Sequence, residues 1–272
     1  MIINSYRFAS VTLPADYGSG AIVAFSLRYV SSSYSGDVIR VRRSSDGTEQ
    51  DFTPIEITDG TLTTFVGSGD GIVVKWYNQG TGGSTYDAEQ NISSRQPKII
   101  SSGLLYAING IAAISFSTDE MRFLAFASSG FTIFCATEPQ FADATFLSGG
   151  DNTSNRFDAG VRTTTDTRTL VSESGTTTRI NTTTNYMNDH MIYVGTKTDL
   201  RINGSSIQTG TISGDLQAYT SSNSIGARRY ESSNTNVQYG QKFMQELIVY
   251  GTDQTSDISD IEDNINDYYS IY

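Results

Sequence analysis

Short apolar runs separated by turn residues recur along the whole chain, and this pattern constrains its fold more than any other feature. Examples are "AIVAFSLRYV", "GIVVKWYN", "FTIFCATE" and "FMQELIVYG". Runs of this length bounded by Gly, Asn and Ser are typical of β strands joined by tight turns. Residues 38–43 alternate with a period of two, which indicates a strand with one wet face. The pair Asn203-Gly204 between two short strands is a strong hairpin signal. An all-β chain is therefore expected.

No break in composition divides the 272 residues, so we expect one domain. Hydrophobic residues make up 37% of the chain, which is enough for a sizeable core and excludes a disordered chain. The Thr-, Ser- and Arg-rich stretch 151–190 is interpreted as strands with polar faces, because apolar residues interrupt it repeatedly. We assign residues 21–272 to the domain and residues 1–20 to an N-terminal arm.

One helix is predicted, over residues 257–268 in the C-terminal segment "TSDISDIEDNINDYYSIY". Thr255 or Ser256 is expected to cap it, and acidic residues suit its first turn. Its apolar face consists of Ile258, Ile261, Ile265 and Tyr268. The carboxylates of the segment are expected to form the solvated face.

Charge and reactive residues exclude several classes of protein. A net charge of −11 argues against binding to nucleic acid, whose phosphates repel an acidic chain. Cys135 is the single cysteine, so no internal disulfide is expected, and within "FTIFCAT" it reads as a buried hydrophobe. The single histidine, His190, stands at a strand entry and is expected to be structural, which disfavours a zinc site or a His-dependent triad.

The N-terminal segment "MIINSYRFASVTLPADYG" has neither a basic region nor an apolar core, so a signal peptide is not expected. No run reaches the roughly 18 apolar residues of a membrane span, so membrane insertion is not expected either. The protein is therefore expected to be made in a cytoplasm and exported, if at all, without a cleaved signal.

Several segments together resemble a known family. They are residues 25–52, "GDGIVVKWYNQGTGGSTYDAEQ", "RQPKII", "NGIAAISFSTDEMRFL", "SIGARRYESSN" and the C-terminal "FMQELIVYG" with the helix that follows. In these motifs the chain resembles the concanavalin A-like, laminin G-type sandwich, most closely the form found in α-L-arabinofuranosidase B catalytic domains. Proteins of tailed bacteriophages carry a similar arrangement. The resemblance implies two packed antiparallel sheets in a jelly roll with a short C-terminal helix. Its motifs are specific for this architecture and say little about enzymatic activity.

Four arginines stand close together near the N-terminus of the acidic chain. They are Arg28, Arg40, Arg42 and Arg43. They form either a patch for an anionic ligand or a framework paired within the chain, and we favour the framework. The expected partners are carboxylates of the following turn, namely Asp46, Glu49 and Asp51. Glu246, in "MQELIVY", is also interpreted as structural.

The resemblance also implies where a glycosidase of this family places its two carboxyl groups. The nucleophilic Glu of the family corresponds to Asp158 in this sequence. The Asp that serves as the family's general acid corresponds to Arg228 or Arg229, and Glu231 lies two residues away. Asp has a shorter reach than Glu, and arginine does not serve as a general acid at neutral pH. The family's "WYDQSG" departs here to "WYNQGTG", with Asn78 in place of Asp. We predict a non-enzymatic relative without catalytic residues, and a glycoside hydrolase of arabinofuranosidase type is the alternative.

A lectin-like domain of this kind is expected to bind a host or environmental glycan, because sugars offer C–H faces to aromatic rings and hydroxyls to polar groups. The candidate residues are Trp76, Tyr77, Asn78, Tyr86, Asp151, Asn152, Asn155, Asp158, Arg229, Tyr230 and Asn234. Trp76 has a competing interpretation as a core residue. No cofactor is expected, and Ca²⁺ held by Asp119, Glu120 and Asp151 is the alternative.

The absence of a signal peptide, the single cysteine and the resemblance favour a bacteriophage virion structural protein. It would be a capsid decoration or fibre component or a tail adhesin, in contact with other virion proteins and with itself as a homo-oligomer. An internal structural plug without a ligand is a further alternative. The apolar residues of the N-terminal arm, Ile2, Ile3, Phe8, Val11 and Leu13, are expected to mediate docking or to fold back on the sandwich.

Overall fold

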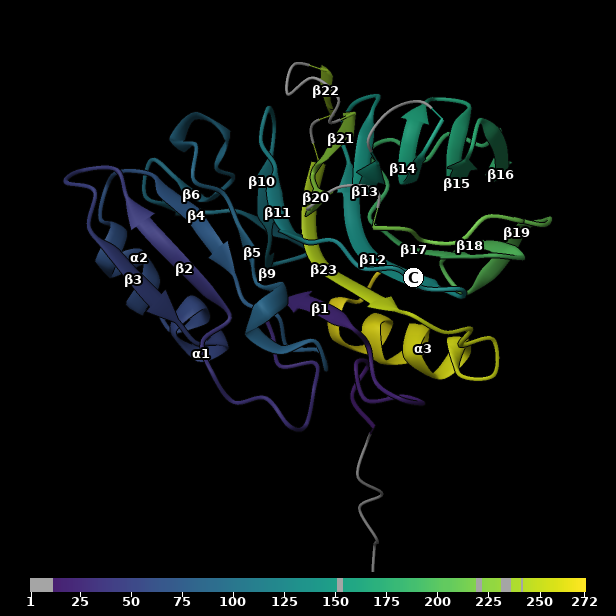
Figure 1. Ribbon diagram of the computed structural model, residues 1–272. Helices are drawn as coiled ribbons and strands as arrows, with labels where there is room; N and C mark the ends of the chain where they lie inside the picture. The colour runs from purple at the N-terminus through teal and green to yellow at the C-terminus, as the bar shows by residue number, and fades with distance from the viewer. Residues whose placement is uncertain (1–11, 151–153, 219–221, 231–235, 241) are drawn as a thin grey trace, which may run out of the picture.

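The computed structural model describes residues 12–150, 154–218, 222–230, 236–240 and 242–272. Its paired strands are antiparallel and form two facing layers with the main core between them (Figure 1). The fold is therefore the all-β sandwich with a short C-terminal helix that the sequence predicts. Among the described residues, no helix is long and apolar enough to cross a membrane.

The layer next to the C-terminal helix is called here the helix-side sheet. Its strands follow the order β19-β18-β17-β12-β23-β1, and β10 continues beside β23 beyond β1. The strands are β1 (Val23–Ser26), β10 (Ile114–Phe116), β12 (Thr132–Pro139), β17 (Met191–Thr196), β18 (Asp199–Ile202), β19 (Ser205–Thr209) and β23 (Lys242–Tyr250). The predicted hairpin joins β18 to β19, and Asn203 and Gly204 have φ values of 51° and 75°, which a primed turn requires.

The second layer is called here the outer sheet. Its strands follow the order β3-β2-β4-β5-β11-β20-β13-β14-β15-β16. In addition, β6 lies beside β4, and β7 lies beside β6. The strands are β2 (Ile39–Arg43), β3 (Glu49–Phe52), β4 (Gly71–Trp76), β5 (Ala88–Glu89), β6 (Lys98–Ser101), β7 (Leu104–Leu105), β11 (Met121–Leu124), β13 (Ala144–Gly150), β14 (Arg156–Thr163), β15 (Asp166–Glu173), β16 (Thr176–Thr182) and β20 (Ser222–Ile225). The polar stretch 151–190 thus contributes β14, β15 and β16, as predicted.

Two short hairpins stand apart from these sheets. They are β8 (Ala107–Ile108) with β9 (Ile111–Ala112), and β21 (Ala227–Tyr230) with β22 (Asn236–Tyr239). A pairing of Ser115 on β10 with Lys98 on β6 joins the two layers.

Helical segments are more numerous than the one that the sequence analysis predicts. They are α1 (Pro54–Thr58), α2 (Thr61–Val66), α3 (Ile258–Tyr269) and the 3₁₀ turns η1 (Gly83–Tyr86) and η2 (Ser93–Arg95). Thr53 and Glu56 form a reciprocal capping box at the start of α1, and Pro54 follows the cap. This signal is present in "TPIE", although no helix is predicted there from the sequence.

The C-terminal helix α3 covers the face of the helix-side sheet that points away from the main core, alongside β1 and β23 (Figure 1). Its buried apolar face ends with Tyr269 rather than the predicted Tyr268, which is 41% exposed. The predicted cap is also wrong, because Asp257 occupies the cap position without a side-chain hydrogen bond. Thr255 instead donates to Asp253.

Both reactive residues singled out in the sequence are structural. Cys135 is fully buried in β12, and burial raises the pKa of its thiol. His190 lies 2.8 Å from Gln245 Oε1 through Nε2 and 3.1 Å from Asn109 Nδ2 through Nδ1. Burial lowers the pKa of His190, so the imidazole is held neutral between these two amides.

The described part of the N-terminal arm folds back on its own sandwich. Ala15 is buried and donates its N–H to Val30 O at 2.9 Å, and Asn264 on α3 donates to Thr12 O. Of the arm residues expected to dock, Leu13 is partly buried here, and Ile2, Ile3, Phe8 and Val11 lie outside the described residues. A docking role of the arm stays a proposal.

The arginines near the N-terminus are paired within the chain, as the framework interpretation predicts. Arg40 binds Asp51 at 2.7 Å, and Arg43 binds Asp46 at 2.6 Å. Arg42 donates to Gln96 at 2.7 Å, so the expected pairing with Glu49 is not formed by this residue.

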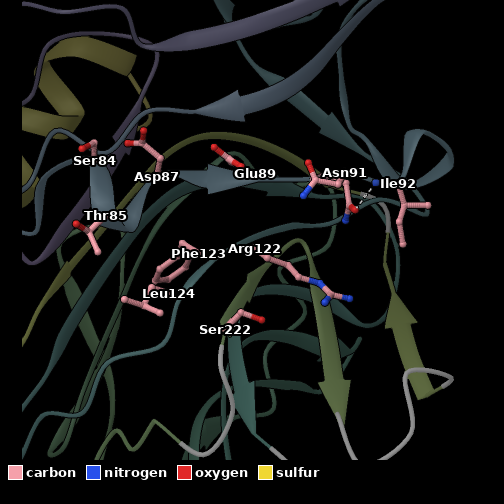
Figure 2. A pocket seen from close by; sticks show the side chains of 11 residues that line it. Ser84, Thr85, Asp87, Glu89, Asn91, Ile92, Arg122, Phe123, Leu124 and Ser222 are labelled. Carbon is pink, nitrogen blue, oxygen red and sulfur yellow. Dashed lines mark hydrogen bonds between the residues drawn. The ribbon is translucent and has the colours of Figure 1, made fainter.

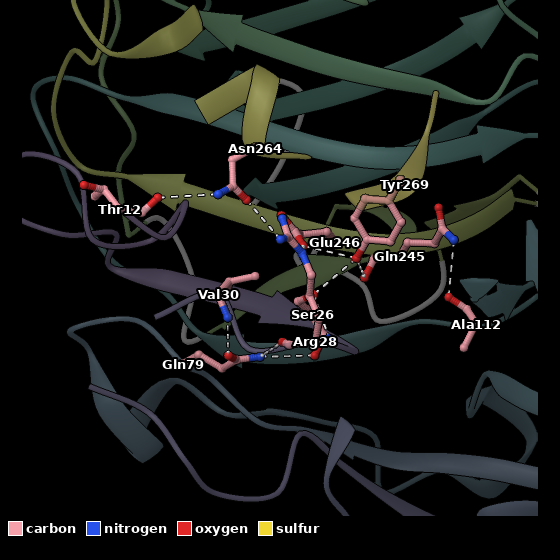
Figure 3. Close-up of polar contacts among 10 residues, drawn as sticks. All are labelled: Thr12, Ser26, Arg28, Val30, Gln79, Ala112, Gln245, Glu246, Asn264 and Tyr269. Carbon is pink, nitrogen blue, oxygen red and sulfur yellow. Dashed lines mark hydrogen bonds and ion pairs between the residues drawn. The ribbon is translucent and has the colours of Figure 1, made fainter. Parts of the chain in front are cut away.

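The fourth arginine, Arg28, reaches a partner far away in the sequence. Its guanidinium binds Glu246 on β23 at 2.9 Å and 3.2 Å and donates to Asn264 on α3. Ser26 and Tyr269 complete this buried network (Figure 3). Glu246 is therefore structural, as the sequence analysis predicts.

Candidate functional site

A cleft of about 500 Å³ opens at one end of β5, β11 and β20 (Figure 2). Its polar lining consists of Ser84, Thr85, Asp87, Glu89, Gln90, Asn91, Arg122 and Ser222. Ile92 and Leu124, each 45% exposed, add aliphatic surface. A cleft of this volume accommodates a small-molecule or sugar ligand, and its side chains come from a rigid sheet and the turn before it.

A second cleft of about 340 Å³ shares Glu89, Gln90 and Asn91 with the first, so the two lie side by side. Its other lining residues include Arg40, Arg42, Glu49 and Lys75. Together the clefts form a polar depression that extends from β2 to β20.

Strand register explains why charged side chains line this depression. Directly opposed residues on neighbouring strands share one face of a sheet. The pairings Arg40–Lys75, Lys75–Glu89, Glu89–Arg122, Arg122–Ser224, Ser224–Ser148 and Ser148–Asp158 follow one another from β2 to β14. Of these seven residues, Arg40, Lys75, Glu89 and Arg122 line the clefts, whereas Ser224, Ser148 and Asp158 are buried.

Ion pairs hold the polar side chains of the clefts in place. Lys75 Nζ lies 2.5 Å from Glu89 and 3.7 Å from Asp87. Burial raises the pKa of Asp87, while the Asn78 N–H and the Lys75 ammonium partly oppose that rise. Arg122 lies 3.3 Å from the fully buried Glu120. The first cleft therefore presents fixed acceptors on one wall and a guanidinium on the other.

Two predicted ligand residues are corrected, because both are buried within the fold. Trp76 is fully buried and packs against Phe25, so it is a core residue and not a platform for a sugar. Asn78 is 3% exposed, and its side-chain amide accepts from Ala24 N and Gly80 N and donates to two carbonyls. All four hydrogen-bonding positions of this amide are occupied, so it braces the turn after β4.

Two of the three predicted tyrosines, Tyr77 and Tyr86, are partly buried near this turn. Tyr77 donates its hydroxyl to Asp51 at 2.7 Å, and the Lys75 ammonium lies 5.3 Å from its ring centroid. Tyr86 packs edge-on against Phe126. Neither lines the first cleft, although Ser84 and Thr85 of the same turn do.

The remaining predicted residues lie elsewhere. Asp158 is 2% exposed on β14, about five strand spacings or roughly 24 Å from β4. Asn155 accepts a hydrogen bond from Ser174 N. Arg229 and Tyr230 belong to β21, but their side chains are outside the described part of the structure. Asp151, Asn152, Glu231 and Asn234 also lie outside the described residues.

The described carboxylates of the calcium alternative, Asp119 and Glu120, already have partners within the chain. Glu120 is bound by Arg95, Arg122 and Ser224, so its carboxylate is already engaged. Asp119 accepts from Ser117 N. In the part of the chain that the structure describes, no three His, Cys, Asp or Glu side chains gather as a metal site would require.

The residues that line the first cleft, chiefly Glu89, Asn91, Arg122 and Leu124, are not among those predicted from the sequence. The segments "STYDAEQN" and "EMRFL" contain them, and their polar character is visible in the sequence. Their proximity depends on a single pairing of the two-residue strand β5 with β11, which local patterns do not reveal.

No protein-family model and no curated protein sequence matches the chain. Among solved structures, it is similar to botulinum neurotoxin type C, described as entering cells in dependence on two ganglioside molecules, with 10% identity and a TM-score of 0.46. That match covers 85% of this chain and 51% of the toxin structure, so the chain spans about half of its length.

Two further structures are similar to the chain. Domain 4 of AbnA, a GH43 extracellular arabinanase from Geobacillus stearothermophilus in complex with arabinotriose, matches with 13% identity and a TM-score of 0.38, covering 89% of this chain and 98% of that one. Trypanosoma rangeli sialidase in complex with the inhibitor DANA matches with 8% identity and a TM-score of 0.37, covering 72% and 31%. These similarities concern fold alone.

Proposed function

We propose that the chain is a non-catalytic glycan-binding domain and that the first cleft on the outer sheet holds the glycan. The observation that carries the proposal is the mixed lining of this cleft. Hydroxyl, carboxylate, amide and guanidinium groups stand beside the half-exposed side chains of Ile92 and Leu124. A sugar offers hydroxyl edges to such polar groups and C–H faces to such apolar ones.

The glycosidase alternative needs two accessible carboxyl groups across the scissile bond. Asp158 is 2% exposed, and its Oδ1 accepts from Arg168 Nε at 2.9 Å. This burial gives the alternative no support at the position that the family resemblance implies.

The proposed setting of the domain is a bacteriophage virion, as a capsid decoration, fibre or tail adhesin that contacts a host or environmental glycan. This part rests on the sequence resemblance. Absence of the chain from the proteins of purified particles would contradict it.

The binding proposal predicts that Glu89→Gln and Leu124→Ala each weaken glycan binding about tenfold, the loss expected for one hydrogen bond to a charged group or one apolar contact. Glycan-array screening of the whole domain, followed by calorimetry with the best ligand, measures this. Thermal unfolding should change little, because the Glu89 side chain is 45% exposed and solvent screens its pair with Lys75.

Asp267→Asn on α3 is the matched control, because it also removes one exposed carboxylate but lies on the other layer. It should leave glycan binding unchanged. A complete lack of glycan binding, or an equal loss in the control, would refute the proposed function.

A further inference from the structure

The second cleft contains one cationic side chain that no described carboxylate neutralises. The cations that line this cleft are Arg40, Arg42 and Lys75. Arg40 binds Asp51 through two hydrogen bonds of 2.7 and 2.8 Å, and Lys75 binds Glu89 at 2.5 Å. Arg42 forms no ion pair within the described residues, and it donates at 2.7 Å to the neutral side chain of Gln96. A partly exposed guanidinium with unused N–H donors therefore lies in this cleft.

The path of the Arg42 side chain explains why it does not bind the carboxylate opposite it in the sheet. Glu49 on β3 is the cross-strand partner of Arg42. The guanidinium instead reaches across β4 to Gln96, which precedes β6 on the far side of β4. Gln96 is 9% exposed and is itself held, because its Nε2 donates to Gln90 O at 2.5 Å. The guanidinium is thus fixed in the cleft, on the side away from β3.

The second cleft adjoins the first through side chains that solvent reaches. Glu89, Gln90 and Asn91 line both clefts. The Glu89 side chain is 45% exposed, and Asn91 is exposed as well. The distance from β2 through β4 and β5 to β11 is three strand spacings, or about 14 Å. An oligosaccharide of a few sugar units spans this distance, so a ligand that contacts Leu124 in the first cleft can extend to Arg42.

We propose that the second cleft is a subsite for the acidic unit of an oligosaccharide and that Arg42 binds the carboxylate or sulfate of that unit. The inference rests on the proposed function and specifies its ligand as an acidic glycan that occupies both clefts. A guanidinium presents paired N–H donors that match the oxygens of such a group. Because Gln96 already holds the guanidinium, little conformational entropy is lost on binding. The carboxylate of Glu49 repels an anion, so the acidic group belongs on the Gln96 side of Arg42.

Calorimetry with a neutral, a carboxylated and a sulfated form of one array-selected oligosaccharide tests the inference on the whole chain. At low salt we expect an acidic form to bind about tenfold more tightly than the neutral form, the gain expected for hydrogen bonds to a charged group. High salt should remove most of this gain, because the cleft is open to solvent. Arg42→Gln should abolish the gain without changing binding of the neutral form. Arg43→Gln is the matched control, because it makes the same charge change at the next residue of β2, outside the cleft, and it should keep the gain.

Each other outcome contradicts a definite part of the account. Equal affinity of the unaltered chain for the neutral and both acidic forms overturns the inference and leaves the proposed function standing. Failure of every form to bind overturns both. A gain for an acidic form that Arg42→Gln leaves intact, or that Arg43→Gln removes equally, overturns the assignment of Arg42. The comparison of ligands on the unaltered chain stands even where an arginine variant fails to fold.

Discussion

Replacing Glu246 by alanine is expected to lower the free energy of unfolding by about 3–5 kcal/mol, the cost of leaving one member of a buried ion pair alone. The side chains of Glu246 and Arg28 are 1% and 10% exposed, and two hydrogen bonds of 2.9 and 3.2 Å join them. Removal of the carboxylate leaves the guanidinium uncompensated between β1, β23 and α3. It also removes an acceptor for Ser26 and Tyr269. Urea unfolding measures the loss.

The control is Asp46→Asn, which breaks the solvent-exposed ion pair between Asp46 and Arg43. It should change the unfolding curve far less, because solvent screens an exposed pair. Glu246→Gln keeps the shape and an acceptor, so it should fall between the two. Equal effects of Glu246→Ala and Asp46→Asn would refute the assignment of this network as the framework that joins sheet and helix.

Stability is expected to rise between pH 7 and pH 9 through a single buried amine, that of Lys242. Lys242 is fully buried at the start of β23, and burial lowers its pKa to about 7, while Asp119 and Cys135 oppose the shift. Its Nζ donates to Gly226 O and Gly240 O, each at 2.5 Å, and the two N–H groups of a neutral amine satisfy both carbonyls.

The direction of this pH dependence follows from the number of protons that the folded and unfolded states bind. Above pH 7 the unfolded chain, with a lysine pKa near about 10.4, keeps a proton that the folded protein has lost. The free energy of unfolding therefore gains about 1.4 kcal/mol per pH unit from this group, or about 2–3 kcal/mol by pH 9. Below pH 7 both states hold the proton, so the contribution stops changing.

Urea unfolding at pH 7, 8 and 9 compares the unaltered protein with Lys242→Met. The difference in stability between the two should grow with pH, because every other titrating group is common to both. Lys98→Met is the control, since Lys98 is half exposed and its pairing with Asp70 raises its pKa out of this range. Parallel curves for the unaltered protein and Lys242→Met would contradict the buried neutral amine.

The sequence predicted those features that depend on local pattern. The strand runs, the Asn203-Gly204 turn and the burial of Cys135 all depend on residues close in the chain. Pairing of Arg40 with Asp51 also followed, because a short turn joins β2 to β3. The predicted bounds of α3 were wrong by one residue at each end. The segment "DYY" offers two adjacent tyrosines, and only the packing of the helix against the sheet selects Tyr269 as the buried one.

The candidate site was not predictable, because it depends on register between strands that are far apart in the chain. Glu89 and Arg122 meet only through the pairing of β5 with β11. Arg28 and Glu246 are 218 residues apart and meet through β1 and β23. The chemistry of their side chains suggested Trp76 and Asn78 as sugar ligands, yet the same chemistry makes a large ring useful in a core and an amide useful in a buried turn.

The measurement that tests the central claim most directly is an amide chemical-shift titration of the labelled protein with its best glycan. We expect shifts concentrated in residues 84–92 and 122–124, which line the first cleft, and little change in α3 and the β18–β19 hairpin on the other layer. Shifts centred on α3 or on that hairpin, or no saturable shifts with any glycan, would contradict the assignment of the outer sheet as a glycan-binding surface.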